Sequence, residues 1–227
     1  MLAWPGVSLC LEAESLITLE EIRGQIARCR QCDLSKARGQ TVPGEGASRA
    51  DVMLVGEAPG FYEDQHGKPF IGPAGQFLDD LLALAELSRK EVFITNVVKC
   101  RPPGNRDPEP DELAACDGYL RAQIAAIQPK VIVTLGRFSL AKFIPNTRSM
   151  REVHGRALPV EGMVVCAMYH PAAALHQGSL RRVIEDDFRT LPMIIAQAQS
   201  RPPILEPVPV VAAPVLAEQI PLFESFA

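Results

Sequence analysis

Four short apolar runs divide the middle of the chain, at residues 51–55, 92–95, 131–135 and 163–168. The first and third runs stop at a glycine, Gly56 and Gly136. Strands that are apolar on both faces are typical of a parallel sheet with helices on both sides. The runs therefore predict four buried strands of such a sheet.

Segments with helical periodicity lie between the apolar runs, at residues 74–87, at 109–127, just after Gly136, and at 179–198. A further helix is expected after Thr18, with Glu21 placed to complete a capping box and Ile22 and Ile26 on one apolar face. The alternation of strands and helices predicts an α/β fold, a three-layer α/β/α sandwich around a four-stranded, mainly parallel sheet. Residues 38–50 are rich in Gly, Pro and Ser and are predicted to form a loop.

The composition of the 227-residue chain changes near its ends. We expect residues 1–17 to be an N-terminal extension and residues 18–200 to be one folded domain, since domains commonly contain roughly 100–200 residues. Residues 202–227 contain six prolines and no Lys or Arg. Residues 201–227 are therefore predicted to form a flexible, proline-rich tail.

No run approaches the roughly 18 apolar residues that a membrane helix requires. The first ten residues lack the basic start of a secretory signal. We therefore expect a cytoplasmic protein without a membrane partner. In that reducing compartment cysteines bind metal or lie in cores more often than they form disulfides. The net charge of −4 argues weakly against a nucleic-acid partner.

Four of the six cysteines form a pattern: Cys29 and Cys32 as a C-x-x-C pair, Cys100 after the second predicted strand, and Cys116 in the helix beyond it. Four thiolates can bind zinc or an iron–sulfur cluster. Core cysteines or a redox pair are the alternatives, because the distant pair is not diagnostic. Cys166 lies within an apolar run and is expected to be a small core residue.

Ligands of parallel α/β sheets bind beyond the carboxyl ends of the strands. The segments that carry candidate chemistry there are residues 56–60 with Glu63, then 67–75, 95–103 and 169–173. In this order, and interleaved with the four cysteines, they resemble the family 4 uracil-DNA glycosylases, the iron–sulfur branch of the uracil-DNA glycosylase superfamily. The resemblance covers about residues 18–198.

This resemblance implies hydrolysis of the N-glycosidic bond of deoxyuridine in DNA, which leaves an abasic site for base excision repair. Such an enzyme must read a base that has left the stack. Phe70 matches the family residue that stacks on uracil, Asn96 the amide that reads O4 and N3–H, and His170 the histidine that donates to O2. A fixed amide of this kind discriminates uracil from cytosine, and a donor at O2 stabilises charge on the leaving base. From the residues alone, a core phenylalanine, a turn cap and a His-Pro turn are the respective alternatives.

The segment Gly56, Glu57 and Ala58 matches the backbone that approaches the base and the attacking water. Ala58 stands where several superfamily members carry Asp or Asn. Glu57 is the nearby carboxylate that could orient the water, so Glu57 and His170 are the predicted catalytic residues. Glu63 resembles the residue that crowds uracil C5 and excludes thymine, and a solvated loop carboxylate is the equal alternative.

By the same resemblance, Cys29, Cys32, Cys100 and Cys116 bind a [4Fe-4S] cluster. A related branch that holds uracil-DNA very tightly carries a nucleophilic histidine in a basic insert after the second strand. Residues 101–106 contain no histidine here, which favours ordinary turnover over covalent capture.

Contact with the DNA backbone requires cations, and the gap left by a flipped base can take an apolar wedge. The predicted DNA-contacting residues are Lys99, Arg101, Arg106, Arg181 and Arg182, with Leu175 as the wedge. A solvated helix face is the alternative for Arg181 and Arg182.

In the tail, Gln219, Leu222 and Phe223 resemble a short motif by which bacterial DNA-maintenance proteins bind the sliding clamp. A chance match is the alternative. Beyond Arg201 the tail also carries three glutamates and no cation, so the rest of the chain is near neutral. The charge argument against a DNA partner is therefore weak.

The leading hypothesis is a monomeric, monofunctional uracil-DNA glycosylase with a [4Fe-4S] cluster. We expect it to act on uracil in single- or double-stranded DNA in the nucleoid. The alternatives are a non-catalytic iron–sulfur DNA-binding module, a uracil-DNA-capturing relative, and a zinc-stabilised nucleotide-binding domain.

Overall fold

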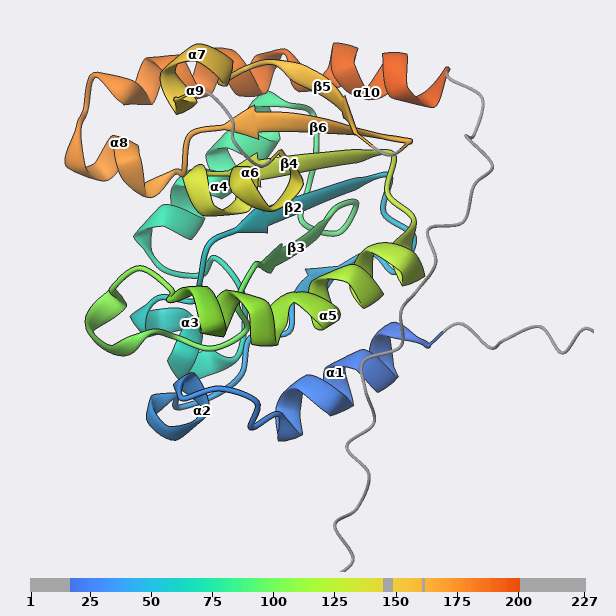
Figure 1. The fold of residues 1–227 in the computed structure, drawn as a ribbon. Coiled ribbons are helices and arrows are strands. Elements are labelled where there is room, and N and C mark those ends of the chain that lie inside the picture. The colour runs from blue at the N-terminus through green and yellow to red at the C-terminus, as the bar shows by residue number, and fades with distance from the viewer. Residues whose placement is uncertain (1–16, 145–148, 161, 201–227) are drawn as a thin grey trace, which may run out of the picture.

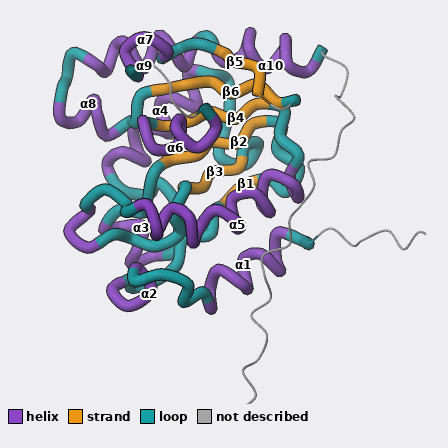
Figure 2. The backbone as a smooth tube through the Cα atoms, viewed as in Figure 1, coloured by secondary structure: helices purple, strands orange, loops and turns teal. Residues whose placement is uncertain are grey.

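A six-stranded sheet forms the middle layer of the fold in the computed structural model, which describes residues 17–144, 149–160 and 162–200. The strand order is β1-β3-β2-β4-β6-β5, and Figure 2 shows the strands side by side between helices. Their bounds are β1 Glu45–Gly46, β2 Val52–Gly56, β3 Phe93–Asn96, β4 Val131–Leu135, β5 Ala157–Val160 and β6 Met163–Met168. The strands β3, β2, β4 and β6 are parallel, which confirms the four predicted strands.

The two edge strands, β1 and β5, run antiparallel and were not predicted. β1 has only two residues, Glu45 and Gly46, and therefore no apolar alternation to detect. β5 is partly exposed and contains Pro159, which is tolerated in a sheet only at an edge or bulge. The predicted four-stranded sheet is thus the parallel centre of a wider sheet.

Helices cover both faces of the sheet. Their bounds are α1 Leu19–Arg28, α2 Leu34–Ala37, α3 Phe61–His66, α4 Pro73–Leu84, α5 Pro110–Ile127, α6 Arg137–Phe143, α7 Met150–Val153, α8 Ala172–His176, α9 Leu180–Arg189 and α10 Leu191–Gln199. Apolar side chains of α4, α9 and α10 pack with one face of the strands, and those of α5 and α6 with the other. The predicted three-layer sandwich is confirmed (Figure 1). None of the helices within the described residues is long and apolar enough to cross a membrane.

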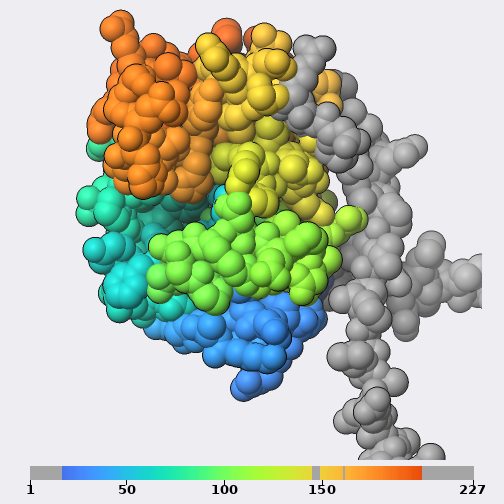
Figure 3. Space-filling model, turned by 60° about the vertical axis from the view of Figure 1, so that its left-hand side comes forward, coloured from blue at the N-terminus to red at the C-terminus, as the bar shows by residue number. Residues whose placement is uncertain are grey.

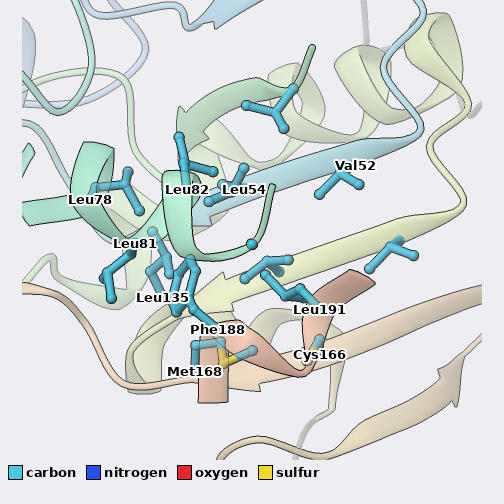
Figure 4. Close-up of a cluster of buried hydrophobic side chains, with 14 of the residues drawn as sticks. Val52, Leu54, Leu78, Leu81, Leu82, Leu135, Cys166, Met168, Phe188 and Leu191 are labelled. Carbon is cyan, nitrogen blue, oxygen red and sulfur yellow. The ribbon is translucent and has the colours of Figure 1, made fainter. Parts of the chain in front are cut away.

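The larger core cluster lies between α4, α9 and the sheet. Leu81 and Leu82 of α4, Leu135 of β4 and Phe188 of α9 are all nearly inaccessible to solvent, and Figure 4 shows them in one group. Burying each such side chain stabilises the fold by about 1.5–3 kcal/mol. This packing fixes the sheet edge on which the candidate site is built.

Two helix boundaries can be compared with the sequence predictions. The capping box at α1 is confirmed, because Thr18 Oγ1 accepts from the Glu21 amide at 3.2 Å and Glu21 Oε2 accepts from the Thr18 amide at 2.8 Å. The single helix predicted over residues 179–198 is wrong, because α9 and α10 meet at Thr190. Pro192 has no amide hydrogen and cannot continue the backbone hydrogen bonds of α9.

The carboxyl ends of the parallel strands meet at one edge of the sheet. Gly56 of β2 and Asn96 of β3 are register partners there, and Gly136 and His170 follow β4 and β6. Figure 1 shows α3 and α8 on the same side, to which the arrowheads of β2 and β6 point. In Figure 3, which brings this side forward, the surfaces coloured teal, green and orange adjoin one another.

Candidate functional site

Four residues, Gly56, Phe70, Asn96 and His170, form the centre of what we call the strand-end site. A Cβ built on Gly56 would lie 2.4 Å from Asn96 Oδ1 and 2.6 Å from Phe70 Cζ. Real Cβ atoms do not approach other atoms so closely, so only glycine allows the amide and the ring to converge here. The structure thus brings together three of the predicted base-binding side chains and explains the glycine between them.

Asn96 presents an unpaired amide oxygen. The residue is 1% exposed, and no described residue donates a hydrogen bond to its Oδ1. An unsatisfied buried polar atom costs about 1–3 kcal/mol. A ligand N–H at this position would remove that cost, so a turn-capping role does not account for the side chain.

Phe70 adopts a backbone conformation that is rare for a bulky residue, with φ of 52°. Arg89 holds the surrounding loop, donating to the carbonyl oxygens of Pro69 at 3.1 Å, of Phe70, and of Gly75 at 3.4 Å. Asp79 in turn accepts from Arg89 Nε. Sequence reasoning missed Arg89, because its main partners are backbone atoms distant along the chain.

Glu63 ties α3 to the loop that follows Phe70. Its Oε1 accepts from the amides of Ile71 and Gly72 at 2.8 and 2.9 Å, and its Oε2 accepts from the Gly60 amide at 3.1 Å. The side chain is buried, so the alternative of a solvated loop carboxylate is wrong. Its predicted role in excluding thymine stays a prediction.

His170 is positioned as a neutral hydrogen-bond donor. Its ring stacks on that of Phe70, with centroids 5.5 Å apart and planes 28° apart. Its Nδ1 accepts from the Ala172 amide at 3.1 Å, so the ring proton of the neutral form is on Nε2. Burial lowers the pKa of His170 to about 4. At neutral pH the ring therefore offers one N–H and carries no charge.

Glu57 lies at the rim of the strand-end site. The residue is half-buried, and burial raises the pKa of its carboxyl, with a further rise from Asp107 and an opposing effect of Arg137. A carboxylate with a raised pKa is better suited to accept a proton from water. The side chain of Ala58, the next residue, packs against the cluster that contains Cys100 and Cys116, and the predicted approach of its backbone to the base stays a prediction.

The four predicted ligand cysteines gather beside the strand-end site. Cys100 and Cys116 are buried together with Leu34 and Val98, and Cys32 packs against them. Cys29 lies near the same groups, because it helps to raise the pKa values of the Cys100 and Cys116 thiols and of the Tyr119 hydroxyl.

Two sulfurs in this region accept hydrogen bonds. The Lys99 amide donates to Cys116 Sγ at 3.2 Å, and Arg38 donates to Cys100 Sγ at 3.1 Å and to the Cys29 carbonyl at 2.7 Å. Burial raises the pKa of Cys116 to about 12, so these thiols become thiolates readily only beside a cationic group. Among the described residues, no three His, Cys, Asp or Glu side chains stand close enough to hold a single metal ion. Four cysteines are the ligand set of structural zinc sites and of iron–sulfur clusters alike, so the donor set fits a thiolate-bound group.

Lys99 was predicted to contact DNA, and this prediction is wrong. Its side chain is 1% exposed, and Nζ donates to Thr95 Oγ1, the Asn96 carbonyl and Gln123 Oε1, each at 2.7 Å. Burial lowers its pKa to about 8. A lysine just after a strand resembles a surface cation in sequence, but this one braces the backbone of Asn96 against α5.

The other predicted DNA contacts lie on the surface, and they differ in whether the side chain is already bound to a carboxylate. Arg106 forms a bidentate pair with Glu112 at 2.9 and 2.7 Å, and Arg181 pairs with Glu185 and covers the ring of Phe77. Arg182 has a side chain that is 90% exposed, and Leu175 is 51% exposed. Residues 1–16 and the tail residues Gln219, Leu222 and Phe223 lie outside the described residues.

Fold and site together define an α/β/α domain that can bind a flat, hydrogen-bonding ring against Phe70, with Asn96 and His170 at its edge. Comparison with known proteins is consistent with this class. The family described as the uracil DNA glycosylase superfamily matches residues 43–189.

Similar proteins include type-4 uracil-DNA glycosylases of Sulfurisphaera tokodaii, 46% identical over 77% of this chain and 83% of that protein, and of Archaeoglobus fulgidus, 44% identical over 80% and 96%. A type-5 uracil-DNA glycosylase of Pyrobaculum aerophilum is 34% identical over 59% of this chain and 66% of its own. The chain belongs to the uracil-DNA glycosylase superfamily, and within it to the type-4 proteins.

Proposed function

We propose that this protein is a uracil-DNA glycosylase that hydrolyses the bond between uracil and deoxyribose in DNA. The observation that carries this proposal is the unpaired, buried Oδ1 of Asn96 beside the stacked rings of Phe70 and His170. A uracil that has left the DNA stack can place its face against Phe70 and its edge against Asn96. Family membership supports the same activity.

Asn96 selects the base. Its Oδ1 accepts from uracil N3–H, and its amide nitrogen donates to O4. Cytosine has an acceptor at N3 and a donor at N4, so both contacts would be repulsive. Sites that require matched hydrogen bonds can discriminate by factors of about 10⁴–10⁵.

His170 assists departure of the base. When the C1′–N1 bond breaks, its electron pair stays on uracil and negative charge develops on O2. The neutral Nε2–H of His170 donates to that oxygen, and this hydrogen bond is stronger in the transition state than in the bound substrate. A water oxygen then bonds to C1′, and Glu57 orients the water and accepts its proton.

Cys29, Cys32, Cys100 and Cys116 hold a [4Fe-4S] cluster in this proposal. The cluster, when bound, crosslinks the segment after α1 to the β3–α5 loop and to α5, and the hydrolysis itself requires no electron transfer. The two N–H···S bonds and the burial of Cys100 and Cys116 support this assignment. Arg101, Arg182 and Leu175 are the candidates for contact with the DNA backbone and the gap left by the base.

The test uses an end-labelled oligonucleotide with one uracil, followed by alkali to cleave an abasic site. Matched oligonucleotides with thymine or cytosine at the same position are the controls. We expect strand scission at uracil alone. Intact DNA, beside a positive control that is cleaved, would overturn the proposal.

For the tail, we propose clamp binding through Gln219, Leu222 and Phe223, and a monomer in solution. Retention of the full chain on an immobilised sliding clamp is compared with that of a chain lacking residues 218–227. Equal retention of the two chains would end the clamp hypothesis.

A further inference from the structure

Two neighbouring aromatic side chains at the start of α3 are about half exposed to solvent. Phe61 is 48% and Tyr62 49% exposed, and their rings meet edge to face with centroids 5.5 Å apart. Among the described residues, only Leu175 and Met193 are other large apolar residues with comparable exposure. Two adjacent exposed rings form an apolar surface that the fold itself does not use.

Arg101 adds an available positive charge to this surface. Its guanidinium carbon lies 5.1 Å from the centroid of the Phe61 ring, and its Nε donates to Asn105 Oδ1 at 2.7 Å. Within the described part of the chain, no carboxylate forms an ion pair with Arg101, whereas Arg106 is bound to Glu112. A phosphate near Phe61 would therefore find a cation that no acidic side chain neutralises.

The two rings stand at the rim of the strand-end site. Phe61 directly follows the turn that begins at Gly56, and a Cβ built on Gly72 would lie 3.0 Å from the Tyr62 ring. Glu63, the next residue of α3, binds the amides of Ile71 and Gly72 beside Phe70. The position of the exposed rings is thus fixed relative to the ring against which the flipped base would stack.

We propose that Phe61 and Tyr62 form a stacking platform for the nucleobase next to the flipped uracil, with Arg101 bound to a phosphate of the same strand. This inference rests on the proposed glycosylase function. The ligand is single-stranded DNA, because a base that stacks on protein must offer a free face. Alternating aromatic and cationic groups are the means by which proteins bind single strands without sequence preference.

The experiment measures binding of single-stranded and duplex oligonucleotides that carry a cleavage-resistant 2′-fluorinated uridine beside the fluorescent base 2-aminopurine. Phe61→Leu/Tyr62→Leu keeps apolar surface but removes both rings. For the double variant we expect Kd for the single strand to rise about tenfold or more, with weaker quenching of 2-aminopurine. Met193→Ala, at an exposed position of α10, is the matched control and is expected to bind like the parent protein.

Arg101→Met gives an independent readout. Loss of one phosphate contact lowers the slope of log Kd against log salt by about 0.7 for single strands. Unchanged binding by Phe61→Leu/Tyr62→Leu, or an equal loss for duplex and single strand, would overturn the platform. Failure of the parent protein to cleave uracil-DNA would instead overturn the proposed function, so the two failures are distinguishable.

Discussion

The ring of His170 stacks on the ring of Phe70 at a centroid distance of 5.5 Å, while its Nδ1 accepts from the Ala172 amide. One contact fixes the position of the imidazole and the other fixes its tautomer. Because Nδ1 is occupied as an acceptor, the neutral histidine keeps its single N–H on Nε2, where it can donate to a negatively charged leaving group. This relationship is the basis of the first prediction.

His170→Ala is expected to reduce kcat by about 10²–10³, as for removal of other donors to a developing anion. Binding of uracil-DNA should change much less, because the hydrogen bond strengthens mainly in the transition state. Single-turnover rates and Kd values measured on one oligonucleotide separate the two effects. A variant with reduced affinity and an unchanged rate would contradict this role.

The depressed pKa of His170 also predicts how stability depends on pH. The pKa is about 4 in the folded protein against an ordinary 6.5, so the unfolded chain binds this proton first. The contribution of neutral His170 is complete above about pH 6.5 and is lost as pH falls through about 4. Urea denaturation between pH 7 and 4 should therefore show a shallower decline for His170→Gln than for the parent protein. Parallel curves would count against a buried neutral histidine.

Gly56→Ala is expected to abolish cleavage, because the new Cβ would collide with Asn96 Oδ1 and the Phe70 ring. Gly118→Ala in α5 is the matched control, since a Cβ at that position would meet no atom within 4 Å outside its own helical turn. Alanine is favoured over glycine inside a helix, so this control should keep its activity and gain up to about 1 kcal/mol of stability. Activity assays and urea denaturation of both variants provide the check. Full activity of Gly56→Ala would mean that the amide and ring do not converge as described.

Arg89→Met removes three hydrogen bonds to the loop of Phe70. We expect KM for uracil-DNA to rise and the free energy of unfolding to fall by about 1–3 kcal/mol, because carbonyl groups of that loop lose their donor. Asp79→Asn removes only the exposed ion pair of Arg89 and should lower the free energy of unfolding by less than about 1 kcal/mol. Steady-state kinetics and chemical denaturation compare the two variants. Equal effects would show that the carbonyl contacts are unimportant.

The cluster assignment predicts a brown protein with broad absorbance in the visible range. Cys100→Ala should lose that absorbance and bound iron, whereas Cys166→Ala, in β6 of the core, should keep both. Iron content and the visible spectrum of the purified variants are the measurements. The assignment would be overturned if Cys100→Ala kept its colour. Stoichiometric zinc in a colourless parent protein would overturn it as well.

Much of the fold could be predicted because each central strand is apolar on both faces, and residues 131–135 and 163–168 form strands with those same bounds. The edge strands were not predicted, since β1 is too short to show a pattern and β5 contains Pro159. The break at Thr190 could have been found from Pro192, whose ring is incompatible with a continuous helix.

For the site, residue type and order indicated Phe70, Asn96 and His170, which the structure brings together around Gly56. Arg89 and Lys99 show where sequence reasoning stops. Arg89 binds backbone carbonyls 14 to 20 residues away, and the buried Lys99 donates to an α5 residue, Gln123. Such hydrogen-bond partners depend on how the loops and helices pack, and residue type alone does not indicate that packing.

Base selection depends above all on the unpaired Asn96 Oδ1, which we propose reads uracil. Its sharpest test is the amount of free uracil released from DNA in a single turnover by the parent protein and by Asn96→Leu, which keeps a similar shape and loses both the amide acceptor and the amide donor. We predict one uracil per abasic site from the parent and a rate lower by at least about 10² from the variant. Equal rates of uracil release by the two proteins would show that the Asn96 amide does not read the base.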